Sequence, residues 1–163
     1  MPHDTIVVGV DDSPQARAAL AWAADAARRT GSILVGVHVL AWPQPGDLLT
    51  DSVVADQVYS DPAQIEAMYR TGSECAFAEV HPEAGWTLRF AQGHPGRILV
   101  DLAGDARMLV LGTRERTGLA RLLDGSTARY CLGHALCTLV VVPARAESID
   151  VRRRRHHQLG GRA

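Results

Sequence analysis

Short apolar runs alternate along this chain with longer segments of helical periodicity. Five runs are rich in branched or aromatic residues, as strands are: Ile6–Val10, Ser32–Leu40, Trp86–Phe90, Met108–Leu111 and Thr138–Val142. In the segments between them, apolar residues recur every three or four positions, which is typical of amphipathic helices. The pattern predicts the element order βαβαβαβαβ.

The predicted helices carry start and stop signals. Ser13-Pro14 and Asp61-Pro62 each place a capping residue before a proline that suits the first helical turn. The first helix should end at Gly31, and the second should run to about Val80. The third follows Gly93-His94-Pro95-Gly96, and the fourth spans Ser126–Ala135.

Strands that alternate with helices need right-handed parallel crossovers. We therefore expect an α/β fold, a three-layer sandwich whose helices cover both faces of a parallel five-stranded sheet. Trp86, Leu88 and Phe90 alternate with polar residues, so their strand should lie near an edge. With strand order 3-2-1-4-5, the order reverses between the first and fourth strands, and ligands of such sheets bind at that point.

The length and composition fit one folded domain with a polar tail. The chain has 163 residues, of which 47% are hydrophobic and 21% charged. We assign residues 1–147 to the domain and 148–163 to a basic, disordered tail. The alternative for the tail is an electrostatic contact between Arg152–Arg155 and nucleic acid or another acidic partner.

The kinds of basic residue in the chain exclude several types of catalytic and binding site. All 17 are arginine, so the chain has no lysine for a Schiff base or a Walker phosphate site. Five arginines follow Val151, which leaves 12 against 18 acidic residues and a net charge of −6 for residues 1–151. An acidic body argues against a nucleic-acid-binding globule.

Three further features bear on location. The longest apolar runs fall far short of the ~20 residues that cross a bilayer. The N-terminal residues resemble no secretory signal, so we expect a cytoplasmic protein without membrane contact. The three cysteines, Cys75, Cys131 and Cys137, are too few for a disulfide framework and are expected to be buried free thiols.

The ends of the first and fourth strands carry the residues of most interest. Asp11 follows the first strand, and Gly112 closes the fourth, ahead of Gly125-Ser126-Thr127. Exposed amides at a helix start favour anions, so the Gly125–Thr127 segment is a candidate phosphate site. A turn with a helix cap at Gly125-Ser126, and an acid that caps the first helix at Asp11, are the alternatives without a ligand.

These segments resemble the signature regions of the universal stress protein family. The resemblance covers roughly residues 4–143 and rests on five segments: Ile6–Ser13, Gly93–Pro95, Met108–Gly112, Gly125-Ser126 and Leu139–Pro143. It implies a Rossmann-like sheet of the adenine nucleotide alpha hydrolase type and homodimers built through the last strand, Leu139–Val142. In one subgroup it also implies ATP binding without a Walker motif.

The chain departs from the nucleotide-binding subgroup at one position. That subgroup has Gly, two residues, Gly, nine residues, then Gly-Ser or Gly-Thr; Gly112 and Gly125-Ser126 match, but Glu115 replaces the second glycine. A glutamate adds bulk and a like charge beside a polyphosphate. At an effective dielectric of ~20, two such charges about 4 Å apart repel by roughly 4 kcal/mol, unless an arginine or a divalent cation intervenes.

The resemblance implies a set of binding residues and no catalytic ones. Asp11 would lie near the base or ribose, and His38 or Val39 beside the adenine, while Gly112, Gly125, Ser126 and Thr127 would face the phosphates of ATP with Mg²⁺ or Mn²⁺. No residue stands out as a catalytic base, so at most slow ATP hydrolysis is expected. Cys131, His134 and Cys137 have metal-like spacing, but on a helix the two thiols diverge, and no metal site is predicted.

Three functions follow as hypotheses. The first is a homodimeric stress-response regulator or sensor that binds ATP. The second is a scaffold without nucleotide, in which Glu115 blocks the crevice and an unknown protein partner carries the function. The third is a nucleotide-dependent enzyme of the broader adenine-binding α/β group, which the missing lysine and nucleophile disfavour.

Overall fold

The structure is a computed structural model that describes residues 4–40, 62–113 and 126–144. Its strands are β1 (Thr5–Gly9), β2 (Ile33–Leu40), β3 (Thr87–Gln92), β4 (Met108–Thr113) and β5 (Thr138–Pro143). Its helices are α1 (Pro14–Thr30), α3 (Pro62–Glu79), α4 (Pro95–Leu102) and α5 (Ser126–His134). All strand pairs are parallel and the order is β3-β2-β1-β4-β5, so the predicted α/β sandwich and its strand order are confirmed.

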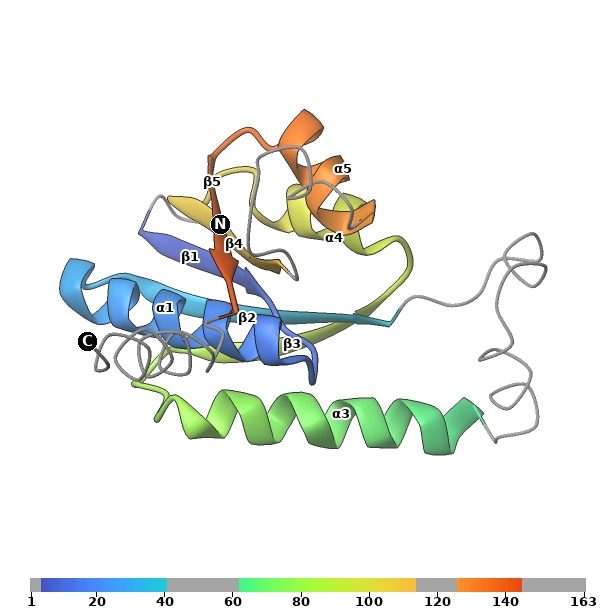
Figure 1. Cartoon of the computed structure of the whole chain (residues 1–163). Coiled ribbons are helices and arrows are strands. Elements are labelled where there is room, and N and C mark those ends of the chain that lie inside the picture. The colour runs from blue at the N-terminus through green and yellow to red at the C-terminus, as the bar shows by residue number, and fades with distance from the viewer. Residues whose placement is uncertain (1–3, 41–61, 114–125, 145–163) are drawn as a thin grey trace, which may run out of the picture.

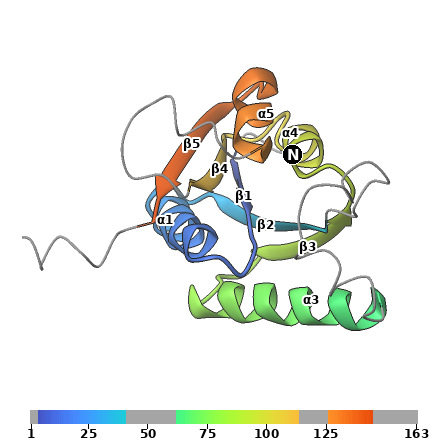
Figure 2. The same cartoon turned by 45° about the vertical axis from the view of Figure 1, so that its right-hand side comes forward.

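The helices cover the sheet from both sides (Figures 1 and 2). One buried cluster joins α1 and α3 to residues such as Ile6, Val8 and Val110. The other joins α4 and α5 to Val7, Val37 and Leu109. Neighbouring residues of a strand thus face opposite layers, which explains why the β1 sequence is continuously apolar.

Local signals set the limits of the elements. Helix α1 begins at Pro14 behind the cap Ser13, and it ends before Gly31, whose φ of 64° is the left-handed conformation that glycine adopts without strain. Helix α4 likewise has Pro95 in its first turn, and the ring of His94 accepts from the N–H of Arg97. The predicted cap Asp61 and the tail, residues 148–163, lie outside the described residues.

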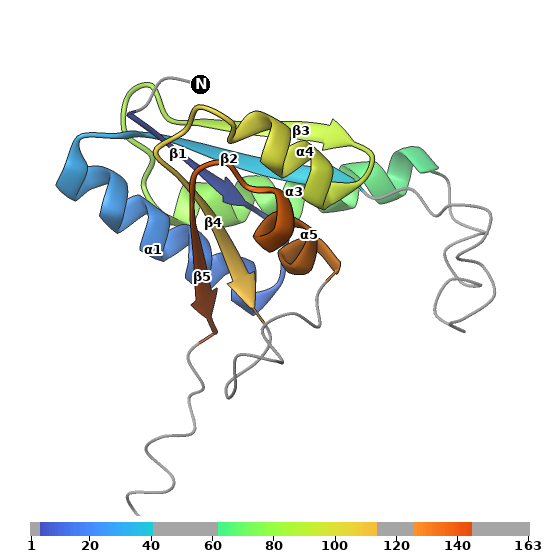
Figure 3. The same cartoon turned by 90° about the horizontal axis from the view of Figure 1, so that it is seen from above.

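Strand β3 lies at one edge of the sheet, as its alternating pattern predicted, and β5 lies at the other. Figure 3 shows the sheet from above, with β4 and β5 side by side. Leu139–Val142 are half-buried, because the layers cover both faces of β5 only in part. Trp86 precedes β3 instead of starting it, and its buried ring lies beneath the guanidinium of Arg28 at 5.1 Å.

Candidate functional site

The strand order reverses between β1 and β4, which are parallel neighbours. Val8 is in register with Val110, so the residues that follow each of them approach the same edge of the sheet. Strand β1 leads through Val10 to Asp11, and Gly112 lies in the last part of β4. The two sequence candidates from these strands therefore lie at one carboxyl edge, where open α/β sheets bind ligands.

A tight turn positions Asp11 ahead of α1. Its carboxylate Oδ1 accepts a hydrogen bond from the N–H of Ser13 at 2.8 Å. The Oγ of Ser13 then accepts from the N–H of Ala16 at 3.2 Å, which makes Ser13 the helix cap. Asp11 therefore supports the turn that carries the cap instead of capping the helix itself, and its exposed side chain lies near the carboxyl end of β1.

Gly112 has a packing role that needs no ligand. A Cβ atom built on it would lie 2.4 Å from the carbonyl oxygen of Gln15 and 2.9 Å from the nitrogen of Ala16. Only a residue without a side chain allows β4 to approach the first turn of α1 this closely. The contact also places the turn at Asp11 directly beside β4, and contact of Gly112 with a phosphate stays a prediction.

An ion-pair network ties the same turn to α3. One guanidinium nitrogen of Arg17 lies 2.7 Å from Asp12, and the other lies 2.6 Å from both carboxylate oxygens of Glu79. These hydrogen bonds raise the pKa of Arg17 above its usual range, so its charge is permanent. Asp12 thus helps to position the turn through its ion pair with Arg17.

The remaining described candidates lie toward the α4 and α5 layer. Val39 in β2 packs partly buried against that layer's core. Ser126 is exposed and Thr127 half-buried at the first residues of α5, whose Ala128 is buried in the same core. Gly125 and Glu115 lie outside the described residues, so the predicted meeting of Asp11 with Gly125 stays untested.

The cysteines fit structural positions in two cases out of three. Burial raises the pKa of the Cys131 thiol to about 11 and also raises that of Cys137, so both resist becoming thiolate ligands. His134 has its Nδ1 2.8 Å from the carbonyl oxygen of Tyr130. Across residues 4–40, 62–113 and 126–144, no group of three His, Cys, Asp or Glu side chains is placed to hold a metal ion.

The expectation that all three thiols are buried holds for Cys131 and only in part for the half-buried Cys137, and it is wrong for Cys75, which is exposed. The reason is helical geometry. Ser73, Ala76 and Phe77 turn into the core from α3, and Cys75 falls between their rows on the outer side. Counting cysteines cannot reveal this, whereas the spacing of the buried residues on the helix does.

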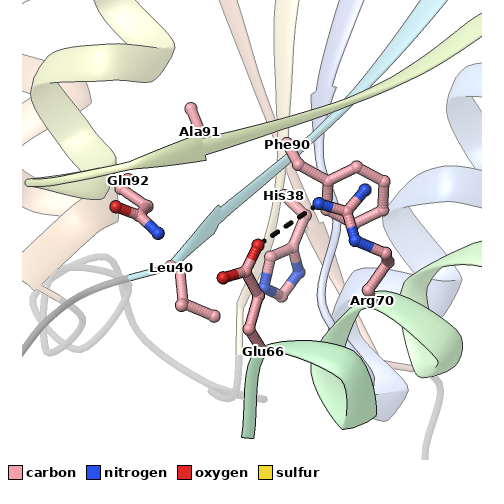
Figure 4. A pocket seen from close by; sticks show the side chains of 7 residues that line it. All are labelled: His38, Leu40, Glu66, Arg70, Phe90, Ala91 and Gln92. Atoms are coloured by element: carbon pink, nitrogen blue, oxygen red, sulfur yellow. Dashed lines mark hydrogen bonds and ion pairs between the residues drawn. The ribbon is translucent and has the colours of Figure 1, made fainter. Parts of the chain in front are cut away.

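The sequence analysis did not predict a pocket on the face of the sheet that α1 and α3 cover. It lies between α3 and the carboxyl ends of β2 and β3, and its polar walls include Glu66, Arg70 and Gln92 (Figure 4). The available signal was the one-turn spacing of Glu66 and Arg70 on the predicted helix, which favours an ion pair. Nothing in the strand pattern shows that this pair faces the ends of two strands.

Comparison with known proteins identifies the family to which this fold belongs. The pattern of the universal stress protein family matches residues 2–143. The chain belongs to this family. It is 32% identical over 144 residues to a universal stress protein of Mycolicibacterium smegmatis, an alignment that covers 84% of the chain and 47% of that relative. The chain thus spans about half the length of this curated relative.

Two solved structures of universal stress proteins share the fold. A complex with cAMP is 24% identical, with a TM-score of 0.59, and the match covers 86% of this chain and 97% of that one. A complex with dAMP from Archaeoglobus fulgidus is 22% identical, with a TM-score of 0.53, over 87% and 97%. At less than 25% identity, these two matches show a shared fold. Within the described residues, no helix is long and apolar enough to cross a membrane.

Proposed function

We propose that this universal stress protein domain binds an adenine nucleotide, ATP with Mg²⁺ or Mn²⁺, at the carboxyl edge of β1 and β4. The observation that carries the proposal is the Asp11 turn, which the close contact between Gly112 and Gln15 holds against β4. Asp11 would contact the ribose or base, and Val39 the adenine. Gly112, Gly125, Ser126 and Thr127 would offer backbone amides and hydroxyls to the phosphates.

Two facts support a nucleotide over other anions. Universal stress proteins of the same fold have been solved with cAMP and with dAMP. In this chain the proposed site would combine a carboxylate at Asp11, suited to ribose hydroxyls, with an apolar side chain at Val39 and the start of a helix at Ser126. A ribose, a base and a phosphate each find a fitting group in that set.

The rival function is a scaffold without nucleotide, and Glu115 is its motivation. A glutamate beside the phosphates repels them unless a divalent cation bridges the two. In either case we propose a small cytoplasmic stress-response regulator and not an enzyme with its own catalytic base. Family membership supports the stress role.

Equilibrium binding of labelled ATP, with and without Mg²⁺, tests the proposal on the full chain. Wild type should bind in the presence of Mg²⁺, Asp11→Ala should bind more weakly, and Glu115→Gly should bind more tightly. Asp25→Asn, on the exposed side of α1, is the control and should bind as wild type does. If wild type does not bind ATP and Glu115→Gly does, the scaffold function is favoured and ATP binding by the natural chain is rejected.

We also propose a homodimer through β5, Leu139–Val142. The motivation is the position of β5 at the sheet edge, with half-buried apolar residues that a second copy would cover. Light scattering across a dilution series should give the mass of two chains. A monomer mass throughout would reject the dimer.

A further inference from the structure

A pocket of about 330 Å³ opens between α3 and the ends of β2 and β3. It lies on the α1 and α3 side of the sheet, whereas Val39 packs toward α4 and α5. Of the candidate nucleotide residues, His38 lines it, whereas Asp11, Val39, Gly112, Ser126 and Thr127 do not. The lining residues come from three elements: His38, Leu40, Glu66, Arg70, Phe90, Ala91 and Gln92.

The helix side of the pocket carries an acid and a base one turn apart. The Nη2 of Arg70 lies 3.3 Å from the Oε1 of Glu66. The guanidinium also lies over the ring of Phe90, with its carbon 4.1 Å from the ring centroid. Stacking on Phe90 fixes the plane of the guanidinium, so its donor directions are set before any ligand arrives.

The floor of the pocket is uncharged. His38 has Nδ1 2.7 Å from the Oγ of Ser73 and a further hydrogen bond to the backbone of Val10. Burial lowers the pKa of its imidazole, which keeps the ring neutral at pH 7. With Glu66 and Arg70 cancelling, the charges of the lining residues sum to zero.

The opposite charges of Glu66 and Arg70 limit the kind of ligand that can bind in the pocket. A simple anion reaching Arg70 meets the charge of Glu66 3.3 Å away, and a simple cation on Glu66 meets Arg70. A ligand that carries both charges side by side satisfies both groups at once. Figure 4 shows Leu40 and Gln92 on the side of Glu66 that lies away from Arg70, so this side of the pocket offers an apolar contact and an amide.

We propose that this pocket binds a free α-amino acid with an apolar side chain. The ammonium group contacts Glu66, the carboxylate contacts Arg70, and the side chain packs against Leu40 and the ring of Phe90. An α-amino acid carries its two charged groups on one carbon atom, so they lie side by side as Glu66 and Arg70 do in the pocket. The volume lies at the small end of ligand pockets, which suits one amino acid.

Isothermal titration of the full chain with L-leucine and L-phenylalanine tests the proposal. At least one of them should bind with a Kd below about 1 mM. N-acetyl-L-leucine lacks the ammonium charge and L-leucinamide lacks the carboxylate, so each should bind at least about tenfold more weakly than leucine. Binding of neither amino acid, or equal binding of the blocked derivatives, would overturn the proposal.

Variants locate the site. Glu66→Gln and Arg70→Gln should each weaken amino acid binding at least about tenfold. Asp25→Asn is the matched control, because Asp25 and Arg29 form the same kind of exposed one-turn pair on α1, 2.6 Å apart. It should bind as wild type does. Circular dichroism melting of each variant shows that it folds, and wild-type affinity in both pocket variants would reject the assignment.

Discussion

The Nδ1 of His38 lies 2.7 Å from the Oγ of Ser73, and this buried contact joins β2 to α3. The hydrogen bond of the same ring to the backbone of Val10 adds the end of β1. A serine beside a histidine resembles a nucleophile with its base, but Ser73 is 0% exposed and no substrate can reach it. The pair instead holds α3 above the sheet near the turn at Asp11.

We predict that Ser73→Ala destabilises the fold by about 1–3 kcal/mol, because it leaves a buried nitrogen of His38 without its partner. Urea unfolding measures the loss. Thr71→Ala is the control on the same helix: its exposed hydroxyl donates to the carbonyl of Ala67 at 2.9 Å, and its removal should cost far less. Equal losses in the two variants would show that burial of the His38 contact adds nothing.

His38 also predicts a pH dependence. Burial lowers the pKa of His38 in the folded chain below its ordinary value of about 6.5, while the unfolded chain keeps that value. Stability is therefore complete above about pH 6.5 and falls as the pH drops from there toward the folded pKa, because the unfolded chain binds the proton more readily. His38→Gln should show a smaller fall between about pH 7 and pH 5 in urea unfolding. The same fall in both proteins would assign it to other groups.

The glycines allow a sharp packing test. Gly112→Ala should destabilise the fold by about 1–3 kcal/mol or more, because its Cβ would overlap the backbone of Gln15. Apart from its chain neighbours and the backbone of its own helix, no atom of the described residues lies within 4 Å of a Cβ built on Gly133 in α5, so Gly133→Ala should stabilise by up to about 1 kcal/mol through helix propensity. Thermal unfolding should give a lower melting temperature for Gly112→Ala and a higher one for Gly133→Ala than for wild type. If Gly112→Ala does not lower the stability, the packing role is rejected, and the close approach of a ligand remains as the reason for this glycine.

Much of the architecture could be predicted because its signals are local. Pro14 and Gly31 define the two ends of α1 through φ alone, and the apolar β1 indicates a strand covered on both faces. The position of β3 at an edge followed from the polar Thr87 and Arg89 between its apolar residues. These features depend only on neighbours along the chain.

The pocket and the packing of Gly112 could not be predicted in this way. The contact between Gly112 and Gln15 joins residues that are far apart in sequence, and it depends on how closely α1 approaches β4. The pocket depends on the rotation of α3 about its axis, which brings Glu66 and Arg70 over the ends of two strands. Motif spacing instead pointed to phosphate contact at Gly112, which remains to be tested by ATP binding.

A variant of Arg17 tests whether its ion pairs position the Asp11 turn or only stabilise the fold. Arg17 bridges Asp12 and Glu79, but all three side chains are at least one third exposed, so Arg17→Gln should cost only about 0.2–1 kcal/mol. The loss should shrink in about 1 M salt, where the Debye length is about 3 Å. If the bridge holds the Asp11 turn, the variant should weaken ATP binding at low salt while its melting temperature hardly changes. Arg29→Gln removes a comparable exposed pair on α1 and should leave ATP binding intact. Equal ATP affinity in the two variants would show that the bridge does not position the turn.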